Sequence, residues 1–371
     1  MKTIFLNFFF FLSLVSFGQT EAINDKIISK INHNSENPLH SILLHINNKS
    51  KNFTYNGAFG LTDKNGEIVT SNSTFKIASS TKLFVATIIL QLQEEGKINI
   101  NDKVFPYLKK LKYLDFENFH TLNKVKYAKE ITIKQLLSHR SGLADIFTDK
   151  QNEFFSLVMK NPTKQYSPKS VVQLYHQFNL NNTPHFTPDK GWCYSDMNYL
   201  LLGLIIEQVD KTTLSNAIRN RILDPLKMEN TYFEFYETSK KEAKPIQQYV
   251  GVTNFSKINT SFDWSGGGLV STNLDLAIYI EALFNLKLIN QNSLDKMIDV
   301  KFTKKNESRY GLGVYEFAIH NDVFYGHFGF YGTFVGYSPK TKTTISYSVS
   351  QATPSFNVYK FIIELLNLAK N

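Results

Sequence analysis

Segments with the pattern of β-strands lie near both ends of this sequence, and the long stretch between them is mostly helical. Runs of β-branched and aromatic residues bounded by turn residues predict strands at 41–46, 53–60, 310–319, 323–327, 333–337 and 343–350. Apolar residues at helical spacing predict helices at 22–33, 79–93, 132–139, 168–178, 196–209, 273–286 and 355–369. The glycine-rich stretch 265–268 predicts a flexible entry to the helix at 273–286. We therefore expect an α+β fold, in which one antiparallel sheet is built from both chain ends and flanked by helices, with a helical subdomain inserted at about 98–265.

The cysteine content limits how such a fold is held together. Cys193 is the only cysteine in 371 residues, so the chain cannot form an internal disulfide. Apolar residues make up 42% of the chain and aromatic residues 14%, which is enough for a large hydrophobic core. Because the sequence contains no repeat and no low-complexity linker, we expect residues 20–371 to form one domain and the protein to be a monomer.

Residues 1–19 have the pattern of a secretory signal peptide. Lys2 precedes an apolar run at 4–17, and the segment ends in the small or polar residues Ser16, Gly18 and Gln19. The run is shorter than the ~20 apolar residues that a membrane-spanning helix usually needs, although an uncleaved N-terminal anchor is the alternative. We therefore expect a mature protein that is secreted or periplasmic.

The charge of the chain excludes one class of partner. The formal net charge is +9, and it becomes +8 without residues 1–19, which contain Lys2 and no acidic residue. The basic residues are scattered in short pairs and form no continuous stripe, so we expect no nucleic-acid partner, whereas contact with anionic cell-envelope polymers fits the charge. The nine histidines show no paired ligand spacing, and we expect neither a metal nor another cofactor.

A candidate nucleophile stands at the start of a helix that reads as buried. Ser79 and Lys82 are one helical turn apart, so their side chains share a face of the helix. A serine hydroxyl attacks acyl carbons usefully only with a base within hydrogen-bond reach, and Lys82 is the candidate for that base. The helix N-terminus would favour the oxyanion formed during acyl transfer. The Ser-x-x-Lys pattern alone is weak, because it also occurs at Ser73 and Ser293.

Two further segments carry groups that suit the same chemistry. Tyr194 and Asp196 directly precede a helix, and Tyr194 can act as a general base if a cation such as Lys82 lowers its pKa. The alternative is a packed tyrosine beside an Asp196 that caps the helix. His327, Gly329 and Phe330 lie at a strand end, where the Phe330 amide can complete an oxyanion hole and His327 can offer a titratable group. The alternative is a hairpin with glycine turns.

At this point the sequence resembles the serine β-lactamase-related superfamily. This superfamily includes class C β-lactamases, penicillin-binding proteins, D,D-carboxypeptidases, D-aminopeptidases and esterases of the same fold. The resemblance extends over nearly the whole mature chain and rests on six motifs that match in order and spacing. These motifs lie at 75–82, 133–143, 194–203, 224–228, 266–272 and 326–329.

The resemblance implies a role for each site residue. Ser79 would be the acylated nucleophile and Lys82 its proton-handling partner, while Tyr194 would shuttle protons to the leaving group and activate the deacylating water. The amides of Ser79 and Phe330 would form the oxyanion hole. Four further motif residues we interpret as structural: His139, Arg140, Gly191 and Gly266.

Two motifs depart from the pattern of class C β-lactamases. Asp196 stands where that class has an asparagine, so a carboxylate that cannot donate when ionised replaces an amide donor. His327 and Phe328 replace the lysine and threonine that would hold a substrate carboxylate. The resemblance therefore favours an exported serine hydrolase acting on an ester or amide, such as a D-amino-acid peptide or a peptidoglycan-derived substrate. The alternatives are a D,D-carboxypeptidase with weak β-lactamase activity and an inactive binding protein on the same fold.

Overall fold

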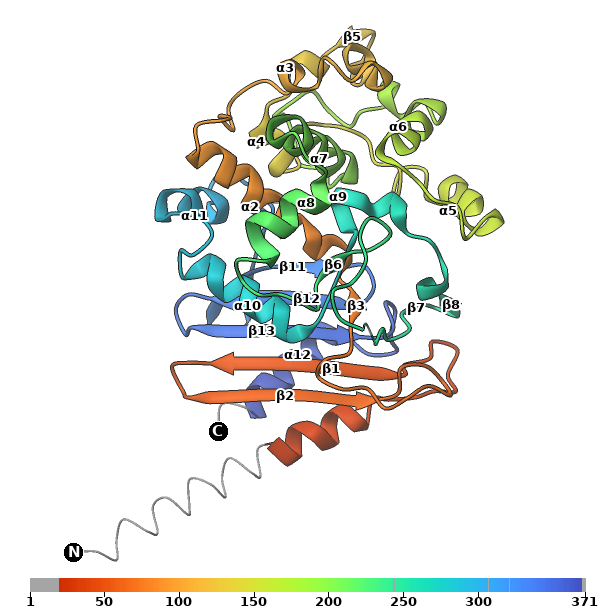
Figure 1. Ribbon diagram of the computed structural model, residues 1–371, viewed down its shortest axis with the longest axis vertical. Helices are drawn as coiled ribbons and strands as arrows, with labels where there is room; N and C mark the ends of the chain where they lie inside the picture. Colours follow the sequence, from red (N-terminus) through yellow and green to blue (C-terminus); the bar gives the residue numbers. More distant parts are fainter. Residues whose placement is uncertain (1–19, 243, 306, 320, 369–371) are drawn as a thin grey trace, which may run out of the picture.

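The computed structural model describes residues 20–242, 244–305, 307–319 and 321–368, so the predicted signal peptide lies outside the described residues. A six-stranded antiparallel sheet forms the lower half of the molecule in the order β10-β11-β12-β13-β1-β2 (Figure 1). Its strands are β1 (Ser41–Asn48), β2 (Phe53–Gly60), β10 (Tyr315–Ile319), β11 (Asp322–Gly329), β12 (Thr333–Ser338) and β13 (Thr343–Val349). The two chain ends meet where β1 pairs with β13, with Ile42 opposite Val349. The predicted α+β fold with a sheet built from both ends is confirmed.

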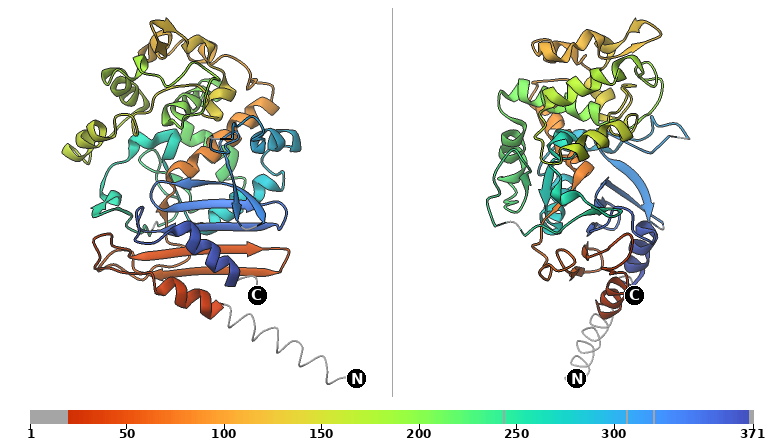
Figure 2. Two further views of the ribbon diagram at one scale, coloured as in Figure 1. Left: turned by 180° about the vertical axis from the view of Figure 1, so that it is seen from behind. Right: turned by 90° about the vertical axis from the view of Figure 1, so that its right-hand side faces the viewer.

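Helices cover both faces of this sheet because successive side chains of a strand point to opposite sides. On β1, Leu43 belongs to the main hydrophobic core, whereas Ile42 and Leu44 belong to a second core. The second core contains the helix at 20–28 and α12 (Val358–Leu368). On the opposite face lies α10 (Asn273–Phe284), as the two orientations in Figures 1 and 2 show.

The remaining helices gather above the sheet (Figure 1). Their bounds are α2 (Thr81–Glu94), α3 (Phe105–Leu108), α4 (Ile133–Leu137), α5 (Gln151–Lys160), α6 (Pro168–Gln177), α7 (Asp196–Asp210), α8 (Leu214–Ile218), α9 (Trp264–Gly267) and α11 (Gln291–Ile298). The predicted start of α4 is confirmed, since Thr132 accepts from the amide of Gln135 in a capping box. None of the helices within the described ranges is long and apolar enough to cross a membrane.

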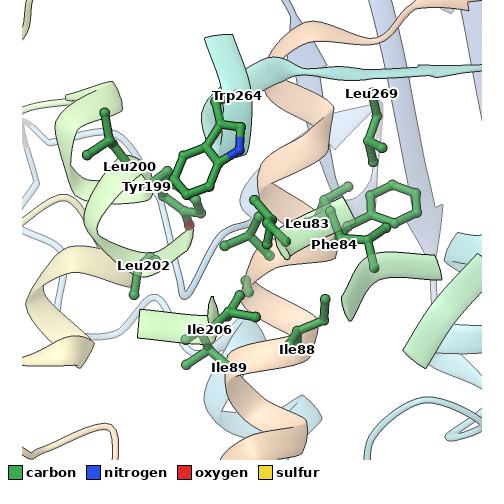
Figure 3. Close-up of a cluster of buried hydrophobic side chains, with 14 of the residues drawn as sticks. Leu83, Phe84, Ile88, Ile89, Tyr199, Leu200, Leu202, Ile206, Trp264 and Leu269 are labelled. Atoms are coloured by element: carbon green, nitrogen blue, oxygen red, sulfur yellow. The ribbon is translucent and has the colours of Figure 1, made fainter. Parts of the chain in front are cut away.

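The central helix α2 is buried on nearly every side. Its side chains Leu83, Phe84, Ile88 and Ile89 pack among residues of α7 and of the 264–269 segment, as Figure 3 shows. Burying a side chain of this size stabilises the fold by roughly 1.5–3 kcal/mol relative to leaving it exposed. The N-terminal end of α2 is therefore held in a rigid environment.

Several predicted bounds differ from the structure. The stretch predicted as a flexible entry at 265–268 is instead the short helix α9, followed by a buried strand, β9 (Leu269–Ser271). This strand lies between β3 (Phe75–Lys76) and β6 (Tyr232–Phe233) in a second, three-stranded sheet. Strands of two or three residues are too short to show a periodicity. The first helix ends at residue 28 because Asn32 pairs with Leu39, and β10 begins five residues later than predicted.

Candidate active site

Ser79 lies in a single 3-10 turn, Ala78–Ser80, that leads directly into α2. Neighbouring hydroxyl groups fix this turn. The buried Ser80 hydroxyl donates to the carbonyl of His327 at 3.1 Å, and Thr81 Oγ1 accepts from the amide of Leu269 at 3.2 Å. The turn is therefore tied to β11 on one side and to β9 on the other.

Lys82 is fully buried beneath Ser79, and its ammonium group is saturated with acceptors. Nζ donates to Ser79 Oγ at 3.1 Å, to Asp196 Oδ1 at 2.5 Å and to the carbonyl of Gly266 at 2.8 Å. A charged lysine has three donors, so this arrangement satisfies all of them. The predicted proximity of Ser79 and Lys82 is present, and proton exchange between them needs no movement of the backbone.

Gly266 is required for this arrangement, and the interpretation of it as structural missed its contact with Lys82. A Cβ atom at this position would lie 2.4 Å from Asp196 Oδ1 and 3.5 Å from Lys82 Nζ. Any larger residue would separate the ion pair. The glycine run of the sequence was the signal for this close approach.

Tyr194 lies just before α7 with its ring against the Lys82 ammonium, whose Nζ is 4.9 Å from the ring centroid. Its hydroxyl group is buried and faces the side chain of Ser79, with no other hydrogen-bond partner among the described residues. Burial, and secondly the charge of Asp196, raise the pKa of Tyr194 well above its ordinary value. The expectation that Lys82 lowers this pKa is therefore wrong for the free site, and Tyr194 is a neutral phenol there.

Asp196 opens α7 and is held by a carboxyl group that the sequence interpretation did not include. Its amide donates to Asp145 Oδ1 at 2.8 Å, and its side chain binds Lys82 rather than capping the helix. Burial and the charge of Asp196 raise the pKa of Asp145 to about 7, and the same causes raise the pKa of the buried Asp263 to about 7. Lys82 is thus one cation among three carboxyl groups. Asp145 follows the motif at 133–143 by two residues, which was the only sequence signal for it.

His327 is buried at the end of β11, and its imidazole is neutral at neutral pH. Its Nδ1 lies 2.7 Å from the carbonyl of Phe328, which can only accept, so Nδ1 carries the proton. Its Nε2 then accepts from the hydroxyl of Tyr310 at 3.1 Å. Burial, and secondly the charge of Lys82, lower the pKa of His327 to about 3. The expectation that His327 presents a group that titrates near neutral pH is wrong.

Gly329 brings the end of β11 against the segment that precedes Ser79. A Cβ atom there would lie 2.2 Å from the carbonyl oxygen of Ile77 and 2.1 Å from Thr333 Oγ1. The next residue, Phe330, is 49% exposed, and its ring packs against Phe255 with the ring centroids 6.1 Å apart. Within the described chain its amide makes no hydrogen bond to another backbone group, as an oxyanion-hole donor requires.

The structure thus brings Ser79, Lys82, Tyr194 and Asp196 together. It also places His327 and Gly329 of β11, and Phe330 directly after that strand, beside the nucleophile turn. The arrangement suits acyl transfer, with a nucleophile, a proton carrier at hydrogen-bond distance and main-chain donors at a strand end. Over the ranges that the structure describes, no group of three or more potential ligands is placed to hold a metal ion.

Comparisons with known proteins agree with this geometry. The family model "Beta-lactamase" matches residues 44–366. The chain is 29% identical over 267 residues to "Putative penicillin-binding protein PbpX" of Bacillus subtilis, covering 70% of this chain and 58% of that protein. It is 33% identical over 180 residues to "Protein flp" of Staphylococcus aureus, covering 48% of this chain and 32% of that protein. The aligned part is thus less than two thirds of the length of either relative.

Solved structures show the same fold. A D-stereospecific amidohydrolase from Streptomyces sp. superposes with a TM-score of 0.76 at 22% identity, covering 92% of this chain and 97% of that one. The D-amino acid amidase from Ochrobactrum anthropi SV3 gives a TM-score of 0.76 at 22% identity, covering 94% and 99%. Since the family model spans most of the sequence, the chain belongs to the beta-lactamase family and has the β-lactamase fold.

Proposed function

We propose that this protein hydrolyses an ester or amide through an acyl-enzyme formed on Ser79. The observation that carries the proposal is the saturated Lys82 ammonium, which lies 3.1 Å from Ser79 Oγ and is held there by Asp196 and Gly266. A nucleophile with a proton carrier fixed at this distance is the requirement for covalent catalysis by serine.

In the proposed reaction, Ser79 Oγ bonds to the carbonyl carbon of the substrate while the bond to the leaving group breaks. Lys82 first passes one proton to Asp196 Oδ1, which lies 2.5 Å from Nζ, and its amine then takes the hydroxyl proton of Ser79. Tyr194 gives its phenol proton to the departing amine or alcohol and regains one from Lys82, which recovers its own from Asp196. The amides of Ser79 and Phe330 stabilise the oxyanion. Water then attacks the acyl carbon, its proton returns to Ser79 Oγ, and the acid product leaves. Because Tyr194 is a neutral phenol in the free site, it acts by donating and regaining one proton.

The charges around Ser79 support a substrate without a carboxylate beside the scissile bond. The positive charge of Lys82 is paired with Asp196, and His327 is neutral, so neither supplies a free cation for a substrate carboxylate. The Asp196 side chain is 19% exposed and can accept from an N–H group. We therefore propose amides or esters that carry an amino group near the acyl carbon. The fold shared with D-amino acid amidases supports D-amino-acid derivatives within this class.

A second candidate is a D,D-carboxypeptidase with weak β-lactamase activity, which the similarity to PbpX favours. For either function we propose an exported, monomeric enzyme. The net charge of +8 calculated for the chain without residues 1–19 would bring it to anionic cell-envelope polymers.

Mass spectrometry of the intact protein tests the acyl-enzyme. We expect a fluorophosphonate to add one label to the wild type and none to Ser79→Ala. Ser80→Ala is the matched control, because it removes the adjacent hydroxyl, which donates to His327 rather than to Lys82, and it should still be labelled. Labelling of Ser79→Ala, or an unlabelled wild type, would contradict the proposal.

Replacing Asp196 with asparagine tests the substrate class. We expect faster acylation by a penicillin and slower hydrolysis of a D-amino-acid amide, because an amide group can donate to a carboxylate and no longer attracts an ammonium. Stopped-flow acylation and steady-state turnover give the two rates. Asp295→Asn makes the same charge change on the exposed side of α11 and should alter neither rate. Unchanged penicillin acylation in Asp196→Asn would refute the role of this charge.

A further inference from the structure

We propose that His139 is a positioning residue that holds the ring of Tyr194 in place for proton transfer. The inference rests on the proposed function, since it assigns Tyr194 a part in acyl transfer. It replaces the interpretation of His139 as only structural. His139 follows α4, whereas Tyr194 precedes α7, so the contact joins two separate motifs.

The polar contacts of His139 converge on the segment around Tyr194. Its carbonyl accepts from the amide of Cys193 at 3.0 Å. Its Nδ1 lies 3.2 Å from the amide of Ser195 and 3.1 Å from Nδ2 of Asn198. The residues on both sides of Tyr194 are therefore attached to one histidine.

The ring of His139 also stacks directly on Tyr194. The two centroids are 4.2 Å apart with an interplanar angle of 30°, the shortest of the ring contacts that Tyr194 makes within the described chain. At the tip of the ring, the Tyr194 hydroxyl has only the Ser79 side chain as a polar neighbour among the described residues. Ring packing and the bonds to neighbouring backbone therefore set most of the position of this phenol.

The backbone at His139 is in the left-handed region, with φ of 56°. Such a conformation is unfavourable for a non-glycine residue and persists where the surroundings require it. With this backbone conformation, the carbonyl of His139 faces the amide of Cys193 and its ring faces Tyr194. Asparagine adopts this conformation readily, which makes it the appropriate replacement.

The contacts also require a neutral imidazole. Two donors point at Nδ1, so the ring proton is on Nε2, and a second proton on Nδ1 would break both bonds. Burial, and secondly the charge of Lys82, lower the pKa of His139 well below its ordinary value. The ring is fully buried among Trp192, Tyr199 and Tyr310.

Two variants of His139 separate its functions. His139→Asn keeps the backbone conformation and an acceptor but removes the stacked ring, and His139→Phe keeps a ring but removes the acceptor. We expect each variant to lower kcat for hydrolysis of a D-amino-acid amide by about 10- to 100-fold, which is the cost of a displacement of about 1 Å in an active site. KM should change by less than threefold, because the site of substrate contact is intact.

His120→Asn is the matched control. The His120 ring is also fully buried and also bonds to the backbone, in its case to the carbonyl of Phe186 at 2.9 Å, but it makes no ring contact with Tyr194. We expect His120→Asn and both His139 variants to lower Tm. In His120→Asn, however, kcat should stay within threefold of the wild type. An equal loss of kcat in His120→Asn would show that general loosening of the core explains the effect.

A spectroscopic readout keeps the test independent of turnover. With 3-fluorotyrosine at position 194, we expect the ¹⁹F resonance to shift and broaden in His139→Asn and to remain unchanged in His120→Asn. An unchanged resonance in both His139 variants would overturn the inference, as would wild-type kcat. If the wild type takes no fluorophosphonate label while the resonance shifts as expected, the proposed function fails and the positioning of Tyr194 stands.

Discussion

Replacing Lys82 with methionine is expected to lower kcat by roughly 10²–10⁴-fold, the usual contribution of a positioned proton carrier. Methionine fills much of the same buried space but cannot take the proton of Ser79. Burst kinetics with a chromogenic ester will locate the loss in the acylation step. Asp196 also loses its partner, so we expect a lower Tm, which circular dichroism will measure.

Lys76→Met is the control for this loss. Lys76 is also a buried lysine, three residues before Ser79, and its ammonium pairs with Glu234 at 2.9 Å and with Thr260 Oγ1 at 2.9 Å. Its replacement should lower Tm by a similar amount while kcat falls by less than tenfold. A kcat for Lys82→Met within tenfold of the wild type would mean that another group carries the proton of Ser79.

Replacing Gly329 with alanine is expected to cost both stability and reactivity. The new methyl group would meet the carbonyl oxygen of Ile77 at 2.2 Å, so the end of β11 must move away from the Ser79 turn. Overpacking of this kind typically costs about 1–3 kcal/mol in the free energy of unfolding. The displaced Phe330 amide would lower kcat by on the order of 10²–10³-fold, the usual cost of losing one oxyanion donor.

Gly326→Ala separates the two effects of that change. Its methyl group would collide with the carbonyl oxygen of Val335 at 2.1 Å, in the same strand but against β12 rather than against the Ser79 turn. Urea unfolding and fluorophosphonate labelling will be measured on both variants. We expect similar losses of stability, with slow labelling only in Gly329→Ala. Equal labelling rates at equal folded fractions would exclude Phe330 as an oxyanion donor.

The sequence pattern predicted those features of the fold and the site that are set by residues only a few positions apart in the chain. The proximity of Ser79 and Lys82 was predictable from their spacing, because one continuous helical stretch contains both residues. The order of strands at the two chain ends was also predictable, since β12 and β13 are long enough to show alternation. Each of these inferences needs only backbone geometry over a few residues.

The protonation states were not predictable, because they depend on burial and on distant charges. Lys82 was expected to lower the pKa of Tyr194. Instead, Lys82 forms an ion pair with Asp196, and burial raises the pKa of Tyr194. His327 was expected to titrate near neutral pH, but burial and the charge of Lys82 lower its pKa to about 3. The carbonyl of Gly266 and the carboxyl of Asp145 reach the site only through folding, from segments 184 and 63 residues away from Lys82 along the chain.

The pairing of β1 with β13 means that the main sheet is complete only after both strands have been made. Strand β1 is made early, but the edge that β13 covers stays open until residue 349 has left the ribosome. The Ser79 turn likewise waits for His327 and Gly329. Contacts of such long sequence separation form slowly, because the chain must close a large loop before they are gained. A ribosome-bound chain that stops before β11 therefore has Ser79 and Lys82 but lacks Gly329 and Phe330 beside them, so we expect it to react slowly with a fluorophosphonate.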